Sequence, residues 1–300
     1  MELTRILGNT WCLTGEVCIP LYCLDGDRCV LIDTGSAAEG EALDAALAGA
    51  GLTPAGILCT HMHYDHNGST QRLRRKWNIP AAMPRGEAEL CRTQAALRSH
   101  LYVFPPALVA GEPILTGLVG PIDRPIEPEE ETLSWCGAEF GILHTPGHSP
   151  DHICVTTPDG VCCLGDCLLT RDVLAASKLP YAFDVGRDLE TKRALRGWQA
   201  PVFLLSHRGA VRGPLTELAD ANAAAMEGVL DLMAAQVAGP MTAGQIYAAL
   251  YLALGLRTNH PVKAAHQERY ARPYLDRLTE TGRLSVWAED GVVWYGPGKR

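Results

Sequence analysis

Six residues, His61-Met62-His63-Tyr64-Asp65-His66, follow a short apolar stretch at positions 56–60 that predicts a buried strand. Three imidazoles and a carboxylate so close together cannot all be buried and hydrogen-bonded at low cost unless they share a partner. Neutral imidazole and carboxylate groups are the ligands of zinc and of similar divalent metals. This stretch therefore predicts a metal site at the end of a strand.

Short apolar strands alternate with amphipathic helices on both sides of the histidine cluster. The pattern predicts strands over residues 11–24, 28–32, 81–83, 131–143, 153–157, 161–164 and 202–205, and helices over 39–50 and 71–77. Such alternation is typical of a layered α/β domain. Residues 95–130 are rich in proline and glycine, and they predict a long irregular insert.

The pattern changes near Pro214. A helix is expected over residues 215–237, a second after the capping box Thr242-Ala243-Gly244-Gln245, and a third around 266–281, kinked or initiated near Pro273. Glu289-Asp290-Gly291 between two apolar runs predicts a hairpin. Helices followed by a hairpin are the layout of a winged helix. We therefore predict a metal-binding catalytic domain at 1–214 and a small winged-helix-like α+β domain at 215–300.

Four further motifs that contain aspartate or histidine lie before and after this cluster along the chain. They are Leu31-Ile32-Asp33-Thr34-Gly35, the stretch from His144 to His152 (HTPGHSPDH), Leu164-Gly165-Asp166 and Leu205-Ser206-His207. With the histidine cluster, they resemble the signature of the metallo-β-lactamase superfamily over roughly residues 5–210. The resemblance implies an α/β fold of four layers, an αββα sandwich.

The resemblance also implies a complete set of ligands for two metal ions. His61, His63 and His148 would hold the first metal, Asp65, His66 and His207 the second, and Asp166 would bridge both. Asp33 is not a ligand in the family and is expected to support the metal loop from behind. His152 is expected to tune or pack beside the site, and it follows Asp151, where many relatives have glycine.

The implied reaction is hydrolysis. Two metals that share a water lower its pKa and give a bridging hydroxide near neutral pH. Asp65 would orient this hydroxide and Asp166 would bridge the metals, so both are expected to be catalytic. Zinc is the first expectation for the metal, and iron or manganese fit the same ligands. Position 63 is His rather than Glu, which argues against the oxygen-reducing diiron branch.

The substrate is less clearly indicated. The first expectation is a small ester, thioester or lactone, held by aromatic residues such as Tyr64, Tyr102 and Tyr181. A phosphodiesterase or ribonuclease is the alternative, and a metal-containing regulatory protein that binds nucleic acid is the third. Residues 217–300 hold eight Lys and Arg against nine Asp and Glu, whereas a nucleic-acid-reading face is normally basic.

Composition sets the remaining expectations. The net charge of -8 and the pI of about 5.7 argue against a nucleic-acid partner without excluding a local basic groove. The first residues lack a signal-peptide pattern and no apolar run is long enough for a membrane span, so we expect a cytoplasmic protein. Several of the eleven cysteines, such as Cys29, Cys59 and Cys154, lie in apolar runs and are expected to be buried thiols, and a disulfide framework is not expected. A homodimer is compatible with a winged helix that lacks a basic face.

Overall fold

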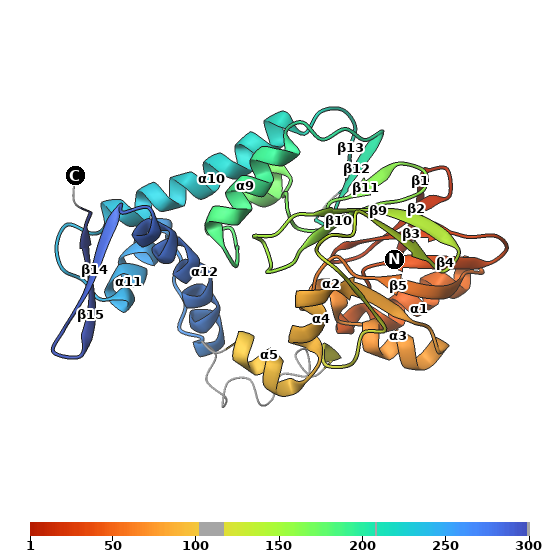
Figure 1. Cartoon of the computed structure of the whole chain (residues 1–300), viewed down its shortest axis with the longest axis horizontal. Helices are drawn as coiled ribbons and strands as arrows, with labels where there is room; N and C mark the ends of the chain where they lie inside the picture. Colours follow the sequence, from red (N-terminus) through yellow and green to blue (C-terminus); the bar gives the residue numbers. More distant parts are fainter. Residues whose placement is uncertain (102–116, 208, 299–300) are drawn as a thin grey trace.

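The computed structural model describes residues 1–101, 117–207 and 209–298 of the chain. Two β-sheets lie face to face with helices on their outer sides, and further helices and a hairpin lie at one end of the molecule (Figure 1). The prediction of a layered α/β fold is confirmed. Within these ranges no helix is long and apolar enough to cross a membrane.

The first sheet has seven strands that are neighbours in chain order, antiparallel from β1 to β4 and parallel from β4 to β7. They are β1 (Glu2–Leu7), β2 (Thr10–Thr14), β3 (Cys18–Cys23), β4 (Arg28–Ile32), β5 (Thr53–Leu58), β6 (Ala81–Pro84) and β7 (Arg124–Ile126). The prediction of one strand over 11–24 is wrong, because the chain turns at 15–17. Val17 is fully buried although it lies in that turn, so its apolar side chain looks like that of a strand residue, whereas Gly15 and Glu16 beside it are exposed.

The second sheet has six strands in the order β13-β12-β11-β10-β9-β8. They are β8 (Thr132–Trp135), β9 (Ala138–His144), β10 (Ile153–Thr156), β11 (Val161–Cys163), β12 (Val202–Leu205) and β13 (Gly209–Val211). Only β11 and β12 are parallel neighbours among these described strands. As a result β9, β11 and β12 all end at the same edge of the sheet.

Helices fill the connections between strands. Those of the first 214 residues that the structure describes are η1 (Ala37–Glu39), α1 (Gly40–Gly49), α2 (Tyr64–Asn67), α3 (Thr70–Trp77), α4 (Arg85–Cys91), α5 (Gln94–His100), α8 (Arg171–Ala176) and α9 (Val185–Leu195). The predicted irregular insert at 95–130 contains α5 and β7, and its residues 102–116 lie outside the described ranges.

Three apolar clusters account for the layers. One lies between the two sheets and joins Val30 and Ile32 of the first sheet to Phe140 and Val155 of the second. A second packs the outer face of the first sheet against α1 and α3, and a third packs the outer face of the second sheet against α9 and the start of α10 (Thr216–Ala235). Burying each large apolar side chain contributes roughly 1.5–3 kcal/mol. The predicted order helix, sheet, sheet, helix is confirmed. All eleven cysteines are free thiols, as predicted.

The C-terminal elements form a fourth cluster. After α10 come α11 (Ala243–Leu254), α12 (Pro261–Glu280) and a hairpin of β14 (Leu284–Glu289) and β15 (Val292–Pro297). The capping box of Thr242 and Gln245 is present, and Asp290 and Gly291 turn the hairpin with φ of 51° and 76°, as their sequence predicts. The third helix begins earlier than predicted, at Pro261, where a proline needs no hydrogen-bonded N–H.

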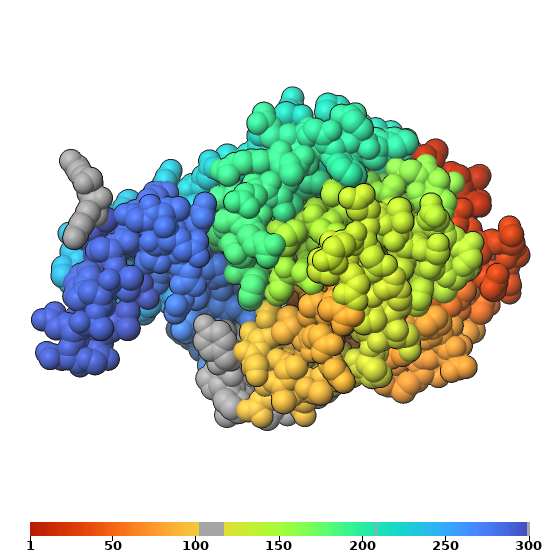
Figure 2. Space-filling model, in the orientation of Figure 1, coloured from red at the N-terminus to blue at the C-terminus, as the bar shows by residue number. Residues whose placement is uncertain are grey.

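The helix α10 contributes to two of these clusters. Ala219 near its start packs against the second sheet, whereas Met226 to Met233 pack among the C-terminal helices. In Figure 1 it runs from the sheet sandwich to the far end of the molecule, and Figure 2 shows the C-terminal elements against the segment around α9. The boundary at 214/215 and the winged-helix assignment stay predictions, because three helices and a hairpin do not by themselves define that domain.

Candidate metal centre

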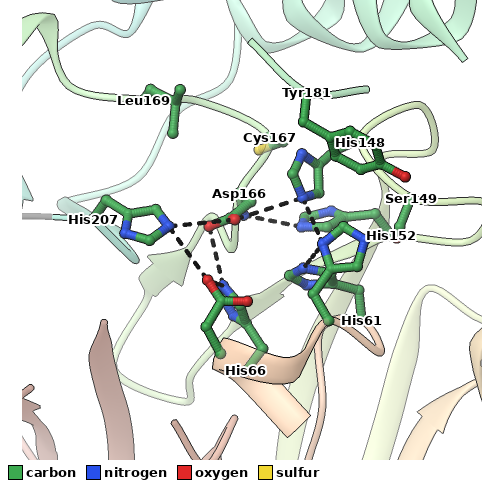
Figure 3. A network of polar contacts seen from close by, with 12 residues as sticks. His61, His66, His148, Ser149, His152, Asp166, Cys167, Leu169, Tyr181 and His207 are labelled. Atoms are coloured by element: carbon green, nitrogen blue, oxygen red, sulfur yellow. Dashed lines mark hydrogen bonds and ion pairs between the residues drawn. The ribbon is translucent and has the colours of Figure 1, made fainter. Parts of the chain in front are cut away.

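The predicted ligands converge at one edge of the two sheets, because each follows the end of a strand that points to this edge. His61 and His63 follow β5, Asp65 and His66 lie in the one-turn helix α2, His148 lies in the β9–β10 loop, Asp166 follows β11 and His207 follows β12 (Figure 3). They form two groups, in each of which the ligand atoms all lie within 4.8 Å of one another.

The first group consists of three imidazoles. His63 Nδ1 lies 3.0 Å from His61 Nε2 and 3.0 Å from His148 Nε2. Burial lowers the pKa of all three histidines, and the neighbouring imidazoles lower those of His61 and His63 further. Neutral imidazoles keep a lone pair on the ring, which is the form that binds a metal.

The second group mixes carboxylates with imidazoles. Asp166 Oδ1 lies 3.2 Å from His66 Nε2, and Asp166 Oδ2 lies 3.5 Å from both His207 Nε2 and His148 Nε2. Asp65 Oδ2 lies 3.8 Å from His207 Nε2. Burial would raise the pKa of Asp166, but the nearby imidazoles of His66 and His207 hold it well below its ordinary value. Asp166 therefore contacts both groups as a carboxylate.

Two buried atoms show that this arrangement fits metal ions. His66 Nε2 and Asp166 Oδ1 are within ion-pair distance of each other but are not aligned for a hydrogen bond, and neither has a hydrogen-bond partner. Buried polar atoms are rarely left in this state, because each one costs about 1–3 kcal/mol. Divalent cations placed within each group would satisfy both atoms.

Asp33 and His152, the two residues expected to support the site, lie behind the predicted ligands. Asp33 accepts hydrogen bonds from the N–H of Thr60 (2.7 Å), the hydroxyl of Thr60 (2.8 Å) and Nδ1 of His66 (2.8 Å). These contacts fix the ring of His66 with Nε2 toward the centre. His152 Nε2 accepts from the N–H of Asp166 (3.1 Å), so its other nitrogen is the one that carries the proton toward the Thr145 hydroxyl (2.8 Å). Both nitrogens of His152 are thus used away from a metal.

A buried glutamate that the motifs do not indicate joins the two histidine loops. Glu87 in α4 accepts hydrogen bonds from the N–H of Met62 (3.2 Å), the hydroxyl of Ser149 (2.7 Å) and the N–H of Asp151 (2.9 Å). Burial raises its pKa to about 7. The one available signal in the sequence is a charged residue on the same helix face as the apolar Ala88 and Cys91. The predicted departure at Asp151 also has a structural role, since its carboxylate accepts from the N–H of Gly86 (2.8 Å).

The helix α9 supports the centre from the other side. Gly147 has φ of 132°, and a Cβ there would lie 2.2 Å from the backbone nitrogen of Asp188, so only glycine allows this approach. Asp188 forms a buried ion pair with Lys192 (2.7 Å), whose ammonium also donates to the carbonyl of Cys167 (3.1 Å), the residue after Asp166. Sequence reasoning missed this pair, because a Lys four residues after an Asp is also typical of an exposed helix face.

A pocket of about 660 Å³ opens from the centre. Of the three tyrosines predicted to contact the substrate, Tyr64 and Tyr181 line it, and Tyr102 lies outside the described residues. The ring of Tyr181 packs against His63 and His148, with centroids 5.3 Å and 5.5 Å away. Arg269 and Tyr270 of α12 line the same pocket and contact Tyr181, so the C-terminal elements contribute to the pocket.

Comparisons with known proteins agree with this geometry. The profile described as the metallo-beta-lactamase superfamily matches residues 21–207, more than half of the chain. The probable metallo-hydrolase YqgX of Bacillus subtilis (strain 168) is 28% identical over 173 residues, which cover 57% of this chain and 72% of that protein. A hydroxyacylglutathione hydrolase of Klebsiella pneumoniae subsp. pneumoniae is 34% identical over 127 residues, which cover 42% of this chain but only 38% of that enzyme.

A solved structure extends the likeness to nearly the whole chain. The crystal structure of a beta-lactamase domain protein from Burkholderia ambifaria matches with a TM-score of 0.73 at 20% identity, covering 99% of this chain and 94% of that one. At this identity the match shows a shared fold. The profile match, the named relatives and the clustered His and Asp side chains lead to the same assignment. The chain belongs to the metallo-beta-lactamase superfamily and is a hydrolase of that superfamily with a His/Asp metal-binding site.

Proposed function

We propose that this hydrolase uses two divalent metal ions to cleave a small ester, thioester or lactone. The observation that carries the proposal is the position of Asp166, which lies between two ligand groups that open into one pocket. His61, His63 and His148 would hold one ion, Asp65, His66 and His207 the other, and Asp166 would contact both. Two ions so placed would lower the pKa of a shared water toward neutrality.

Side chains of the protein would position the attacking water and hold the ligands in place. The side chain of Asp65 is partly exposed on the pocket side, so its carboxylate can orient a nucleophilic water and accept its proton. Asp33 and His152 hold His66 and Asp166 in place through the hydrogen bonds described above. The apolar wall of the pocket excludes bulk water from an acyl group, which strengthens the electrostatic interactions at the centre.

Zinc is the metal that we propose. Its support is the donor set, five imidazoles and two carboxylates with no described thiol among them. Iron and manganese accept the same donors, so metal analysis of the protein as purified, followed by reconstitution of the chelated protein with each metal, tests the identity.

An acyl substrate is favoured over a nucleic acid by two observations. Most of the pocket's surface is apolar, and residues 217–300 carry slightly more acidic than basic groups. The Klebsiella relative is named for hydrolysis of a thioester of glutathione, which supports the acyl class. The phosphodiesterase, ribonuclease and regulatory alternatives are outcomes of the test below. The cytoplasmic location, the homodimer and the winged helix also stay predictions.

A substrate panel tests the proposal. Wild type and Asp65→Ala are assayed on acyl thioesters, lactones, bis(p-nitrophenyl) phosphate and single-stranded RNA, with metal content measured for both proteins. We expect wild type to hydrolyse thioesters or lactones and Asp65→Ala to be slower by about 100-fold or more, the usual contribution of a positioned acid or base. Phosphodiester or RNA cleavage alone would replace the acyl proposal, and equal rates in both proteins would reject the role of Asp65.

A further inference from the structure

Arg269 is a cationic group of the pocket wall that no acid among the described residues balances. Most of the pocket wall is apolar, formed by side chains such as Met62, Leu97, Leu118, Leu169, Val173 and Met226. Lys192 lies at one side and is neutralised by Asp188 at 2.7 Å. Arg269 lies at another side, and among the described residues no carboxylate lies within ion-pair distance of it.

The partners of Arg269 are all neutral acceptors. One terminal nitrogen donates to the carbonyl of His100 (2.8 Å), and the other donates to Nε2 of His100 (2.6 Å) and to the hydroxyl of Tyr181 (3.0 Å). Burial and the guanidinium itself lower the pKa of His100 to about 4, so its ring stays neutral and can accept. The guanidinium also packs on the ring of Tyr181, 5.6 Å from its centroid.

In this environment the charge of Arg269 has no counter-ion among the described residues, and some of its N–H groups have no acceptor there. A guanidinium keeps its charge at any physiological pH and has five N–H groups, of which the three contacts above use three. A partly buried cation without a counter-ion is unfavourable, so the arrangement is explained if the anion arrives with a ligand. Lys263 and the first turn of α12 line the same pocket, and the helix N-terminus adds positive potential there.

We propose that Arg269, assisted by Lys263, binds a carboxylate of the substrate, so that the substrate is an acyl ester or thioester with an apolar body and an anionic end. This inference rests on the proposed function for the reaction but not for the binding. Within the described part of the chain, the Nε–H and one Nη1–H of Arg269 stay free to donate to an anion, and a carboxylate has only two oxygens to satisfy, whereas a phosphate would turn a third oxygen toward a largely apolar wall. Tyr181 contacts both Arg269 and the imidazoles of His63 and His148, so it sets the spacing between the carboxylate and the scissile bond.

Matched thioesters test the inference. Butyryl-N-acetylcysteamine is the neutral probe, succinyl-N-acetylcysteamine carries a carboxylate on the acyl side, and the butyryl thioester of 3-mercaptopropionate carries it on the thiol side. We expect wild type to prefer one anionic probe in kcat/KM by on the order of 10- to 100-fold, the usual range for a charge-assisted hydrogen bond. The preferred probe identifies the side of the substrate that carries the anion.

Three variants assign this preference. Arg269→Gln should abolish it, because kcat/KM falls far more for the anionic probe than for the neutral one. Arg269→Lys should keep part of it, because the charge remains while the planar guanidinium and its contacts with His100 and Tyr181 are lost. Arg272→Gln, one turn away on the same helix, is the matched control, because Arg272 pairs with Asp276 and does not line the pocket. It should keep the full preference.

A binding measurement separates this inference from the proposed function. A non-hydrolysable thioether with the same carboxylate is titrated calorimetrically into the metal-free protein and into its Arg269→Gln variant, beside a neutral thioether. Binding of the anionic thioether that requires Arg269, without hydrolysis of any thioester, would uphold the inference and reject the proposed function. Hydrolysis without an anionic preference would overturn the inference, as would an Arg269→Gln variant that loses neutral and anionic probes equally and has a lower Tm, since Arg269 would then only join α12 to α5.

Discussion

Behind the three imidazoles of His61, His63 and His148 lies the carboxylate of Glu87, and behind the mixed group lies that of Asp33. Both carboxylates are almost fully buried and both accept three hydrogen bonds. Asp33 contacts the ring of a ligand, whereas Glu87 contacts only the backbone and a hydroxyl of the loops that carry the ligands. The first arrangement orients a metal-binding atom, and the second holds two loops together.

The largest expected effect belongs to the residue that contacts both groups. Asp166→Ala removes the carboxylate between them, and we expect kcat/KM for the best thioester to fall by about 10³-fold or more, because the charge stabilisation at such a centre is worth several kcal/mol. The assay needs a circular dichroism control to show that the variant is folded. A loss smaller than tenfold would mean that the two groups work independently.

The second-largest effect is expected on metal content when one ligand is removed from either of the two ligand groups. His61→Ala removes a fully buried ligand of the first group, and His207→Ala removes a partly exposed ligand of the second. We expect each variant to keep about one metal per chain instead of about two, at the group that still has all its donors. Native mass spectrometry during a zinc titration measures this. If either variant retains both metals with unchanged affinity, that histidine is not a ligand.

Asp33→Asn should have an intermediate effect. An amide nitrogen facing Nδ1 of His66 would require that nitrogen to accept, which places the ring proton on Nε2, where the metal should bind. Loss of such a supporting group typically costs 10- to 100-fold in metal affinity or activity, roughly the range we expect here. Asp44→Asn is the control, because Asp44 pairs with Arg72 and Lys76 away from the centre. Equal zinc affinities for Asp33→Asn and wild type would remove Asp33 from the site.

Glu87→Gln should mainly change how stability depends on pH. The pKa of Glu87 is about 7 in the folded protein against an ordinary 4.5, so between these values the folded state keeps a proton that the unfolded chain releases. Its stabilising contribution is present below 4.5 and is lost as the pH rises through 7, a change of about 3 kcal/mol. Denaturant unfolding of the metal-free protein at about pH 5 and about pH 8 measures the difference.

The matched control for that measurement is Glu89→Gln. Glu89 lies two residues further along α4, is exposed and pairs with Arg92. It should keep the pH dependence of wild type, whereas Glu87→Gln should lose part of it. If both variants keep the same dependence, Glu87 does not titrate in this range and its role is limited to its hydrogen bonds.

The predicted ligands converge because their spacing follows the strands. The resemblance to the superfamily implied that His61, Asp166 and His207 share one site, and the structure shows that the strands before them, β5, β11 and β12, end where these side chains meet. The supporting groups are different. Arg269 and His100 are 169 positions apart, and Glu87 meets Asp151 across 64 positions. Such contacts depend on how α4 and α12 pack, which local patterns do not determine.

The positions of the strands could also be predicted only in part from local sequence patterns. Apolar runs and apolar–polar alternation located most strands to within a few residues, because the strands are buried on one face or, as in β6, β11 and β12, on both. This pattern failed at 15–17, where Val17 is buried inside a turn, and within the strand predicted over 131–143, which a turn at Cys136 and Gly137 divides into β8 and β9. It also did not indicate β1 at the edge of the first sheet, none of whose residues is fully buried. An edge strand owes its position to its neighbour's hydrogen bonds rather than to its own burial.

The long helix α10 has a consequence for how the molecule could be altered. Its first turns complete the cover of the second sheet, and its later turns form part of the C-terminal cluster. Cutting the chain at residue 215 would uncover the sheet face beneath Ala219, so residues 1–214 would be left with an apolar surface open to water. If the C-terminal elements were exchanged for those of a relative, the fusion point should therefore lie after α10, in the loop before Ala243, rather than at the start of α10.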